Sequence, residues 1–260
     1  MDAREVVKMP MERVMTQSRE RSIGSKDISC SMSVRFWHKL ARGLAALSPV
    51  KRREKAQWLT RDGVEFLRDA GLRKGDTVID FGCGAGAYSI PAALLVGNDG
   101  LVVSVDVRGP ALKSLVRMAA SRGLGNIRAA QHLAEMAFLL NGRPCRAVLL
   151  YDVLHFMDAD TRKGLYRTFH ERLRPDGFLS VFPKHLKDDS PSRYFRDMTV
   201  EDVSREIEET GFLPCGRLEA DLWHNPDRER STVLTFRKAN GEMAGSVATS
   251  VANEETGWKP

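Results

Sequence analysis

The stretch that most constrains this chain is TVIDFGCGAGAYSIPAA, at residues 77–93. It begins with a short run of β-branched and aromatic side chains after a Lys-Gly-Asp sequence, which is typical of a buried strand. Three glycines then alternate with other residues over 82–86, and an apolar segment of helical type follows from Ala87. We therefore predict a strand that turns directly into a helix in an α/β sheet.

The three glycines have a physical role in such a turn. A strand that passes at once into a helix needs backbone conformations that a Cβ atom obstructs. A ligand lying on the turn also needs close approach to the backbone, and the free N–H groups at the helix start attract a carboxylate or phosphate. These features predict a nucleotide-like ligand, although the same glycines also suit a tight connection that binds nothing.

Two acidic residues support the ligand interpretation. Asp80 lies inside the predicted strand, where a buried acid needs a partner. Asp106 ends a second predicted strand at 101–105, where a carboxylate is placed to accept hydrogen bonds from a ribose diol. The glycine spacing differs from the dinucleotide fingerprint G-x-G-x-x-G, and no Gly-Lys-Ser/Thr follows, which excludes a P-loop.

Together, DFGCGAG at 80–86 and SVD at 104–106 resemble the signature of class I S-adenosylmethionine-dependent methyltransferases. The phrases GAYSIPAA and YDVLHF are similar to the small-molecule branch that includes the ubiquinone and menaquinone biosynthesis C-methyltransferases. The resemblance extends over residues 71–238. It implies an α/β, Rossmann-like fold with a seven-stranded, mostly parallel sheet, helices on both faces, an N-terminal helical cap, and S-adenosyl-L-methionine as cofactor.

Because ligands of open α/β sheets lie at the carboxyl ends of the strands, the residues that follow each strand are the candidates for binding. The resemblance implies that the glycine turn meets the methionine part of the cofactor, that Asp80 binds its amino group and that Asp106 holds the ribose hydroxyls. Val107 or Arg108 would flank the adenine. The full set of candidate cofactor-binding residues is Asp80, Gly82, Cys83, Gly84, Gly86, Tyr88, Asp106, Val107, Arg108, His132, Leu133, Tyr151 and Asp152.

Two of these positions need separate comment. After the third predicted strand the family often carries an acidic residue near the adenine, whereas this chain has Gln131 and His132 there. After the fourth strand, Tyr151 and Asp152 are expected to border the sulfonium. Cys83 lies in the glycine turn, and we interpret it as a small residue whose backbone faces the ligand rather than as a nucleophile.

A general base is needed for methyl transfer only if the acceptor carries a proton that must leave. The candidates are His155, one helical turn beyond Asp152, and His185, in the loop after the fifth strand, because imidazole titrates in the useful range. Each also suits a purely structural histidine. No N-P-P-Y/F tetrapeptide follows the fourth strand, which counts against methylation of exocyclic nitrogens in nucleic-acid bases.

Four segments are predicted along the chain: an arm at 1–32 expected to be disordered, a helical cap at 33–75, the methyltransferase domain at 76–238 and a tail at 239–260 expected to be disordered. Strands are expected at 77–81, 101–105, 127–130, 147–150 and 178–182, with two late strands at 212–219 and 231–237. Helices are expected at about 87–96, 110–122, 134–140 and 159–174, with a further helix starting at a capping box over 199–202.

Charge and cysteine content bound the remaining possibilities. The net charge is +6, and residues 1–75 hold 17 Lys and Arg against 9 Asp and Glu. The excess of positive charge therefore lies ahead of the glycine turn. The four cysteines lack CxxC spacing, and no metal site is expected. With no apolar run long enough for a membrane span and no signal-peptide pattern, we predict a cytoplasmic location.

The preferred hypothesis is a transferase that moves a methyl group from S-adenosyl-L-methionine to a small-molecule acceptor. One alternative is an RNA or protein methyltransferase that uses the basic N-terminal region. The other is a cofactor-fold protein that binds a partner and has no turnover. The sequence specifies neither the acceptor nor the oligomeric state.

Overall fold

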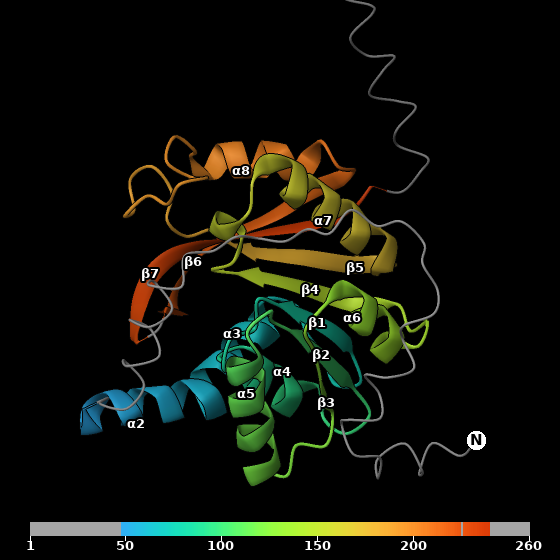
Figure 1. The fold of residues 1–260 in the computed structure, drawn as a ribbon, viewed down its shortest axis with the longest axis vertical. Coiled ribbons are helices and arrows are strands. Elements are labelled where there is room, and N and C mark those ends of the chain that lie inside the picture. Colours follow the sequence, from blue (N-terminus) through green and yellow to red (C-terminus); the bar gives the residue numbers. More distant parts are fainter. Residues whose placement is uncertain (1–47, 225, 240–260) are drawn as a thin grey trace, which may run out of the picture. The chain divides into compact units, whose positions relative to one another are not determined.

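The computed structural model describes residues 48–224 and 226–239 of the 260-residue chain. In this part of the chain, seven strands form one sheet in the order β3-β2-β1-β4-β5-β7-β6, with helices on both sides (Figure 1). This confirms the predicted α/β, Rossmann-like fold class. The predicted arm at 1–32, residues 33–47 of the predicted cap and the tail from 240 lie outside the described residues, and all four segment boundaries stay predictions.

The strands pair in parallel from β1 to β5, and the last two run antiparallel. Their bounds are β1 Thr77–Phe81, β2 Leu101–Val105, β3 Ile127–Ala130, β4 Cys145–Tyr151, β5 Leu173–Phe182, β6 Phe212–His224 and β7 Asp227–Lys238. The first three agree with the predicted ranges because each is a short apolar run with turn residues on both sides. β1 lies centrally, between β2 and β4.

The helices connect the strands in the expected alternation. They are α2 Pro49–Gln57, the π-helical segment η3 Trp58–Asp62, α3 Gly63–Asp69, α4 Ser89–Val96, α5 Gly109–Ser121, α6 Leu133–Leu140, the 3₁₀ turn η4 Leu154–Phe156, α7 Ala159–Arg172 and α8 Val200–Glu208. The predicted capping box is present at the start of α8, where the Thr199 and Asp202 side chains each accept from the other's backbone N–H.

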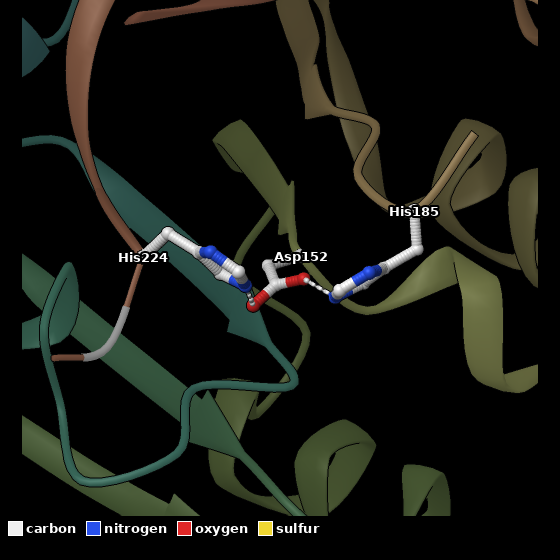
Figure 2. Close-up of side chains that lie close together, drawn as sticks. All are labelled: Asp152, His185 and His224. Atoms are coloured by element: carbon white, nitrogen blue, oxygen red, sulfur yellow. Dashed lines mark ion pairs between the residues drawn. The ribbon is translucent and has the colours of Figure 1, made fainter. Parts of the chain in front are cut away.

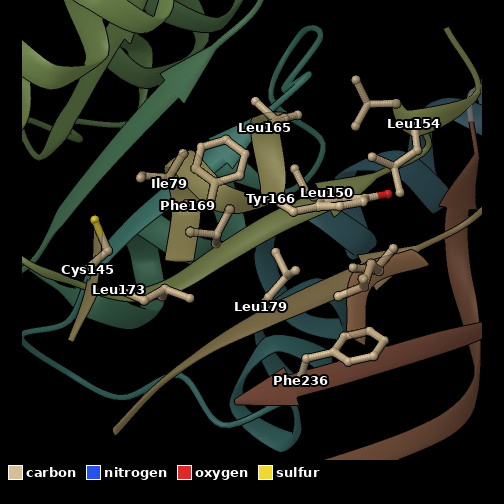
Figure 3. Packing of buried hydrophobic residues seen from close by; sticks show 14 of the residues in the cluster. Ile79, Cys145, Leu150, Leu154, Leu165, Tyr166, Phe169, Leu173, Leu179 and Phe236 are labelled. Carbon is tan, nitrogen blue, oxygen red and sulfur yellow. The ribbon is translucent and has the colours of Figure 1, made fainter. Parts of the chain in front are cut away.

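Adjacent residues of a strand face opposite sides of the sheet, and the core is divided accordingly. Val78 packs with residues of η3, α3, α4 and α5, whereas its neighbour Ile79 packs with residues of α6, α7 and α8. Figure 3 shows the second cluster, in which Phe169 and Tyr166 of α7 lie against the strands beside Ile79. A parallel sheet covered on both faces leaves its strand ends as the accessible edge for a ligand.

Several predicted boundaries are wrong. The helix expected to reach residue 174 ends at Arg172, because Leu173 is extended and buried and pairs with Cys145 as the first residue of β5. The late strands are also longer than predicted, reaching His224 and starting at Asp227, which pair with each other. Because Leu222 and Trp223 are buried, β6 continues past the predicted end at residue 219.

The helices that precede the sheet are anchored by Trp58. Its side chain is fully buried, and its indole N–H donates to the backbone carbonyl of Ala87 at 2.8 Å. Its ring also packs edge-on against Tyr88, with centroids 5.5 Å apart. This contact joins the first described helices to the segment that follows the glycine turn.

Candidate active site

The glycine turn has the backbone conformation that its sequence predicts. Gly82, Gly84 and Gly86 have φ values of 79°, 55° and 90°, in the region that side chains disfavour. A Cβ at Gly82 would overlap the Cβ and a γ-methyl group of Val153, and one at Gly86 would overlap the end of the Leu115 side chain. A side chain at Gly82 would therefore distort the turn between β1 and α4, whereas one at Gly86 would require Leu115 to move.

Asp106, just after β2, binds the middle of this turn. Its carboxylate accepts the Gly84 backbone N–H at 2.7 Å, and it also accepts both the backbone N–H and the guanidinium of Arg108. The side chain is almost fully buried. Asp106 therefore lies at the carboxyl end of β2, next to the turn, which is the position expected for a residue that holds a ribose.

Asp80 is a buried carboxyl group with a short chain of hydroxyl partners. Ser89 donates to it at 2.5 Å, and Ser104 of β2 donates to Ser89 at 2.8 Å. Burial raises the pKa of Asp80 to about 7, with the nearby Asp106 carboxylate acting in the same direction. A cation placed beside Asp80 would favour its ionised form, so the residue fits the predicted contact with the cofactor's amino group.

Two tyrosines of the candidate set lie in the buried layer near the turn. The hydroxyl of Tyr88 donates to the Trp223 carbonyl at 3.1 Å, and that of Tyr151 pairs with Ser180 at 2.7 Å. Their rings are 4.5 Å apart, and burial raises the pKa of both phenols. Both hydroxyls are already hydrogen-bonded within the protein, and contact of either tyrosine with the cofactor stays a prediction.

Cys83 is also buried, and burial raises the pKa of its thiol well above the ordinary value. A thiol with a raised pKa stays protonated and is a poor nucleophile. Its backbone N–H donates to Val105, which ties the turn to the end of β2. The structure thus supports the interpretation of Cys83 as a small residue of the turn.

The residues predicted to lie near the adenine of the cofactor are more exposed than the residues around the glycine turn. Val107 is 68% exposed, and Arg108 is half-buried against Asp106. His132 is exposed immediately before α6, and Leu133 is half-buried at its first position. Gln131, beside His132, reaches the Val107 carbonyl with its amide at 3.4 Å, so the ends of β2 and β3 are in contact.

Asp152 stands at the centre of a histidine cluster at the ends of β4, β5 and β6 (Figure 2). Oδ2 of its carboxylate lies 3.2 Å from His224 Nε2, and Oδ1 lies 3.8 Å from His185 Nε2 and 3.6 Å from His155 Nδ1. Asp152 has a φ of 54°, which turns the chain sharply after β4. The structure therefore brings both predicted base candidates to one of the predicted cofactor residues.

The histidines of this cluster differ in environment. His155 is 6% exposed, and burial lowers its pKa to about 4. The hydrogen bond that His224 donates to the Asp152 carboxylate raises the pKa of His224 to about 9, against the effect of burial. His155 is therefore neutral near pH 7, and a base role for His155 or His185 stays a prediction.

Sequence reasoning missed several members of this site. His224 was placed in a loop because β6 was predicted to end at residue 219, and Ser89 and Ser104 carry no motif of their own. Glu229 bonds His224 from the neighbouring strand, a contact that only the hairpin register creates. The alternation of apolar residues past 219 is the signal that would have extended β6 as far as His224.

Comparisons with known proteins agree with this geometry. The family model for a methyltransferase domain matches residues 78–177, from β1 into β5, a region that includes the glycine turn, Asp106 and Asp152. A solved SAM-dependent methyltransferase from Aquifex aeolicus is 17% identical, with 74% of this chain and 98% of that chain covered and a TM-score of 0.51. At this identity the likeness shows the fold alone.

Curated relatives match over shorter stretches. Aklanonic acid methyltransferase of Streptomyces sp. (strain C5) is 35% identical over 111 residues, which cover 38% of this chain and 49% of that protein. Nocamycin O-methyltransferase of Saccharothrix syringae is 41% identical over 73 residues, which cover 25% of this chain and 26% of that protein. The chain thus spans between about a quarter and a half of the length of these relatives.

Residues 78–177 therefore match a methyltransferase domain, and the two curated relatives are methyltransferases over the stretches that they share with this chain. This agrees with the predicted methyltransferase family. Among residues 48–224 and 226–239, no helix combines the length and apolarity needed to cross a membrane.

Proposed function

We propose that this protein is a methyltransferase that transfers a methyl group from S-adenosyl-L-methionine to a small-molecule acceptor. The observation that carries the proposal is the pairing of two acids around one glycine turn. Asp80 lies under the turn in β1, and Asp106 bonds the Gly84 N–H from the end of β2. An acid for an ammonium group and an acid for a ribose diol at adjacent strand ends suit this cofactor.

The residues of the turn would bind and orient the cofactor. Asp80 would pair with its amino group, the backbone at Gly82 and Gly84 would lie against its methionine part, and Asp106 would exchange part of its contact with Arg108 for the ribose hydroxyls. When bound, S-adenosyl-L-methionine supplies an electrophilic methyl group on a sulfonium. The protein's own contribution is alignment and exclusion of water.

The acceptor would enter beside Asp152, since the chain after β4 lies directly against the glycine turn at Val153. The two relatives named above are described as methyltransferases of nocamycin and of aklanonic acid, and this supports a small organic acceptor here. A polar cluster of one carboxylate and three histidines suits an acceptor with an ionisable oxygen or sulfur. Such a group can lose its proton before or during transfer.

Transfer of a labelled methyl group tests the proposal. Full-length protein would be incubated with methyl-labelled S-adenosyl-L-methionine and separate panels of phenols, quinol precursors, thiols, RNA and protein. We expect label to enter one of the small-molecule panels, and entry to be lowered in Asp106→Ala at a subsaturating cofactor concentration. Label entering only RNA or protein would contradict the proposed acceptor class, and cofactor binding with no transfer to any panel would contradict the enzymatic role.

The segment boundaries belong to the same proposal. We propose an arm at 1–32, a helical cap at 33–75, a domain at 76–238 and a tail from 239. Limited proteolysis of the full chain with mass spectrometry should cleave first in the arm and the tail and leave the domain joined to its cap. Early cleavage between residues 76 and 238 would contradict these boundaries.

We also propose a cytoplasmic location. Cys83, Cys145 and Cys215 are free thiols, and free thiols persist in a reducing compartment. Cell fractionation with antibodies to the full chain would test this, and recovery of the protein in an extracytoplasmic fraction would contradict it.

A further inference from the structure

The cluster around Asp152 has the composition of a metal site. Two imidazole nitrogens and one carboxylate, from His224, His185 and Asp152, come within 4.8 Å of one another (Figure 2). They belong to three separate elements, the ends of β4 and β6 and the loop after β5. The fold therefore brings together three ligand-type side chains that are 33 residues or more apart in the sequence.

The orientation of both imidazole rings is fixed by a hydrogen bond at Nδ1, on the side of the ring away from Asp152. His224 Nδ1 lies 3.1 Å from a carboxylate oxygen of Glu229, and His185 Nδ1 lies 3.1 Å from the Ser190 carbonyl. Because a carboxylate and a carbonyl only accept hydrogen bonds, each Nδ1 carries the proton. Nε2 of both histidines faces Asp152, at 3.2 Å for His224 and 3.8 Å for His185. A cation between them would take the place of the Nε2 proton, because metal binding to imidazole releases a proton.

The spacing around Oδ1 of Asp152 is the second observation. This oxygen is buried and has no hydrogen-bond partner, although two histidine nitrogens approach it to 3.6 and 3.8 Å. An ion with ligands at roughly 2.0–2.2 Å in tetrahedral geometry separates neighbouring ligand atoms by about 3.3–3.6 Å. Among the three proposed ligands, the Asp152 carboxylate lies 3.2 Å from His224 and 3.8 Å from His185, on either side of this range. All three ligand atoms lie within 4.8 Å of one another, so a bound ion would draw them closer together.

The groups behind the histidines are themselves held in place. Lys184 is 7% exposed and pairs with Glu229 at 2.6 Å and with Asp189 at 2.7 Å. Asp189 in turn accepts the backbone N–H of His185. One buried lysine therefore holds both the acid that contacts the His224 ring and the acid that accepts the His185 backbone N–H, which is the kind of outer support that metal ligands commonly have.

We propose that Asp152, His185 and His224 bind one divalent transition-metal ion, with zinc as the reference ion. Imidazole and carboxylate ligands suit zinc and its neighbours better than magnesium or calcium, which prefer sets of oxygen atoms. Three protein ligands leave an open coordination position. In a part of the inference that rests on the proposed function, that position would hold an oxygen or sulfur atom of the methyl acceptor.

Zinc binding to metal-free, full-length protein without a polyhistidine tag tests the site directly. Competition with a chromogenic chelator gives the affinity, elemental analysis gives the stoichiometry, and the visible spectrum of the cobalt(II) form reports coordination by nitrogen and oxygen. We expect one zinc per chain, with magnesium and calcium failing to displace it. Absence of stoichiometric zinc binding would overturn the proposal.

Variants identify the ligands. Asp152→Asn and His224→Gln should each weaken zinc binding by more than the roughly 10–100-fold that loss of an outer partner costs, and Glu229→Gln should fall within that range. His170→Gln, at a histidine on α7 outside the cluster, is the matched control and should bind as the unmodified chain does. Zinc affinity that is equal in Asp152→Asn, His224→Gln and the control would also overturn the proposal.

Folding and cofactor binding are measured on the same samples. His185→Asn serves as a third ligand variant if another fails to fold, because asparagine tolerates the left-handed backbone at this position, where φ is 62°. Circular dichroism in the presence of a chelator checks the fold. Binding of S-adenosylhomocysteine is titrated separately, so loss of the metal and failure of the proposed function are distinguished.

Discussion

Asp106 and Gly84 are joined across the sheet edge by a 2.7 Å hydrogen bond from the glycine N–H to the carboxylate. The bond links the end of β2 to the middle of the turn after β1, 22 residues earlier. The same carboxylate also holds Arg108. One acid therefore sets the shape of the turn and remains at the place where a ribose is expected.

Asp106→Ala should weaken binding of S-adenosylhomocysteine by about 1–3 kcal/mol, the scale of lost hydrogen bonds to a charged group. Titration calorimetry measures the change. Asp99→Ala is the matched control, because Asp99 is an exposed acid that follows α4 and pairs only loosely with Lys74 at 3.7 Å. Equal affinity in the two variants would contradict the ribose assignment.

Asp80→Asn should make the ligand-free protein more stable at high pH relative to the unmodified protein, while weakening its binding of S-adenosylhomocysteine. In the ligand-free protein burial raises the pKa of Asp80 to about 7, above its value in the unfolded chain. Between about pH 4 and pH 7 the carboxyl group therefore ionises more readily in the unfolded chain than in the folded protein, and the folded protein loses stability as the pH rises. The amide of Asp80→Asn does not ionise, so the variant does not lose this stability. From pH 5 to pH 8, the free energy of unfolding of the variant should rise relative to the unmodified protein by on the order of 2 kcal/mol.

Urea unfolding at the two pH values measures this difference. Binding of S-adenosylhomocysteine to Asp80→Asn should be weaker at pH 8, because the amide carries no charge to pair with the ligand's amino group. A stability difference that does not change with pH would show that Asp80 is not the buried acid described here.

Gly82→Ala should be more destabilising than Gly75→Ala by about 1–3 kcal/mol, the usual cost of overpacking. Both glycines have positive φ, so an alanine at either position pays a similar cost in backbone strain. A Cβ at Gly82 would lie 2.4 Å from Val153, whereas one at Gly75 has no atom within 4 Å. Denaturant unfolding of both variants measures the gap.

The double variant Gly82→Ala/Val153→Ala tests the cause of that gap. Removing the Val153 branches opens the space that the new methyl group needs, so a double-mutant cycle should show a favourable coupling energy. Strictly additive effects would mean that contact with Val153 is not what requires glycine at 82.

Arg162→Met should lower the free energy of unfolding by about 3–5 kcal/mol, because it leaves Glu206 buried without its charge partner. Arg162 and Glu206 join α7 to α8 through two bonds of 2.8 and 2.6 Å, and the arginine is 2% exposed. Lys163 and Glu209 join the same helices on the surface, and Lys163→Met should have a much smaller effect.

Replacing both members of the buried pair, as in Arg162→Met/Glu206→Leu, should recover part of the loss. Thermal or denaturant unfolding of the set measures each step. A double variant that is less stable than Arg162→Met would contradict the account of an uncompensated buried charge.

The strands around the glycine turn were predictable because their signals are local. The apolar residues at 77–81 and the glycines that follow specify β1 and its turn without help from distant parts of the chain. Asp80 and Asp106 follow from the same pattern, since each occupies a set position relative to a strand end. The predicted fold class and these candidate residues therefore needed no contact information.

The histidine cluster was only partly predictable because it depends on distant contacts. His155 and His185 were identified as candidates by their place after strands, but His224 comes from a hairpin whose length is decided by the burial of Leu222 and Trp223. The early start of β5 at Leu173 has the same origin, since pairing with Cys145 outweighs the Pro175-Asp-Gly177 turn signal. The expectation of no metal site considered the cysteines alone.

The central claim is that the turn between β1 and α4 binds S-adenosyl-L-methionine. The most direct test is calorimetric titration of the full-length protein with S-adenosylhomocysteine, with NAD as the control ligand. We predict saturable one-to-one binding of S-adenosylhomocysteine and no heat of binding with NAD. Absence of S-adenosylhomocysteine binding, or equal binding of both ligands, would contradict the account.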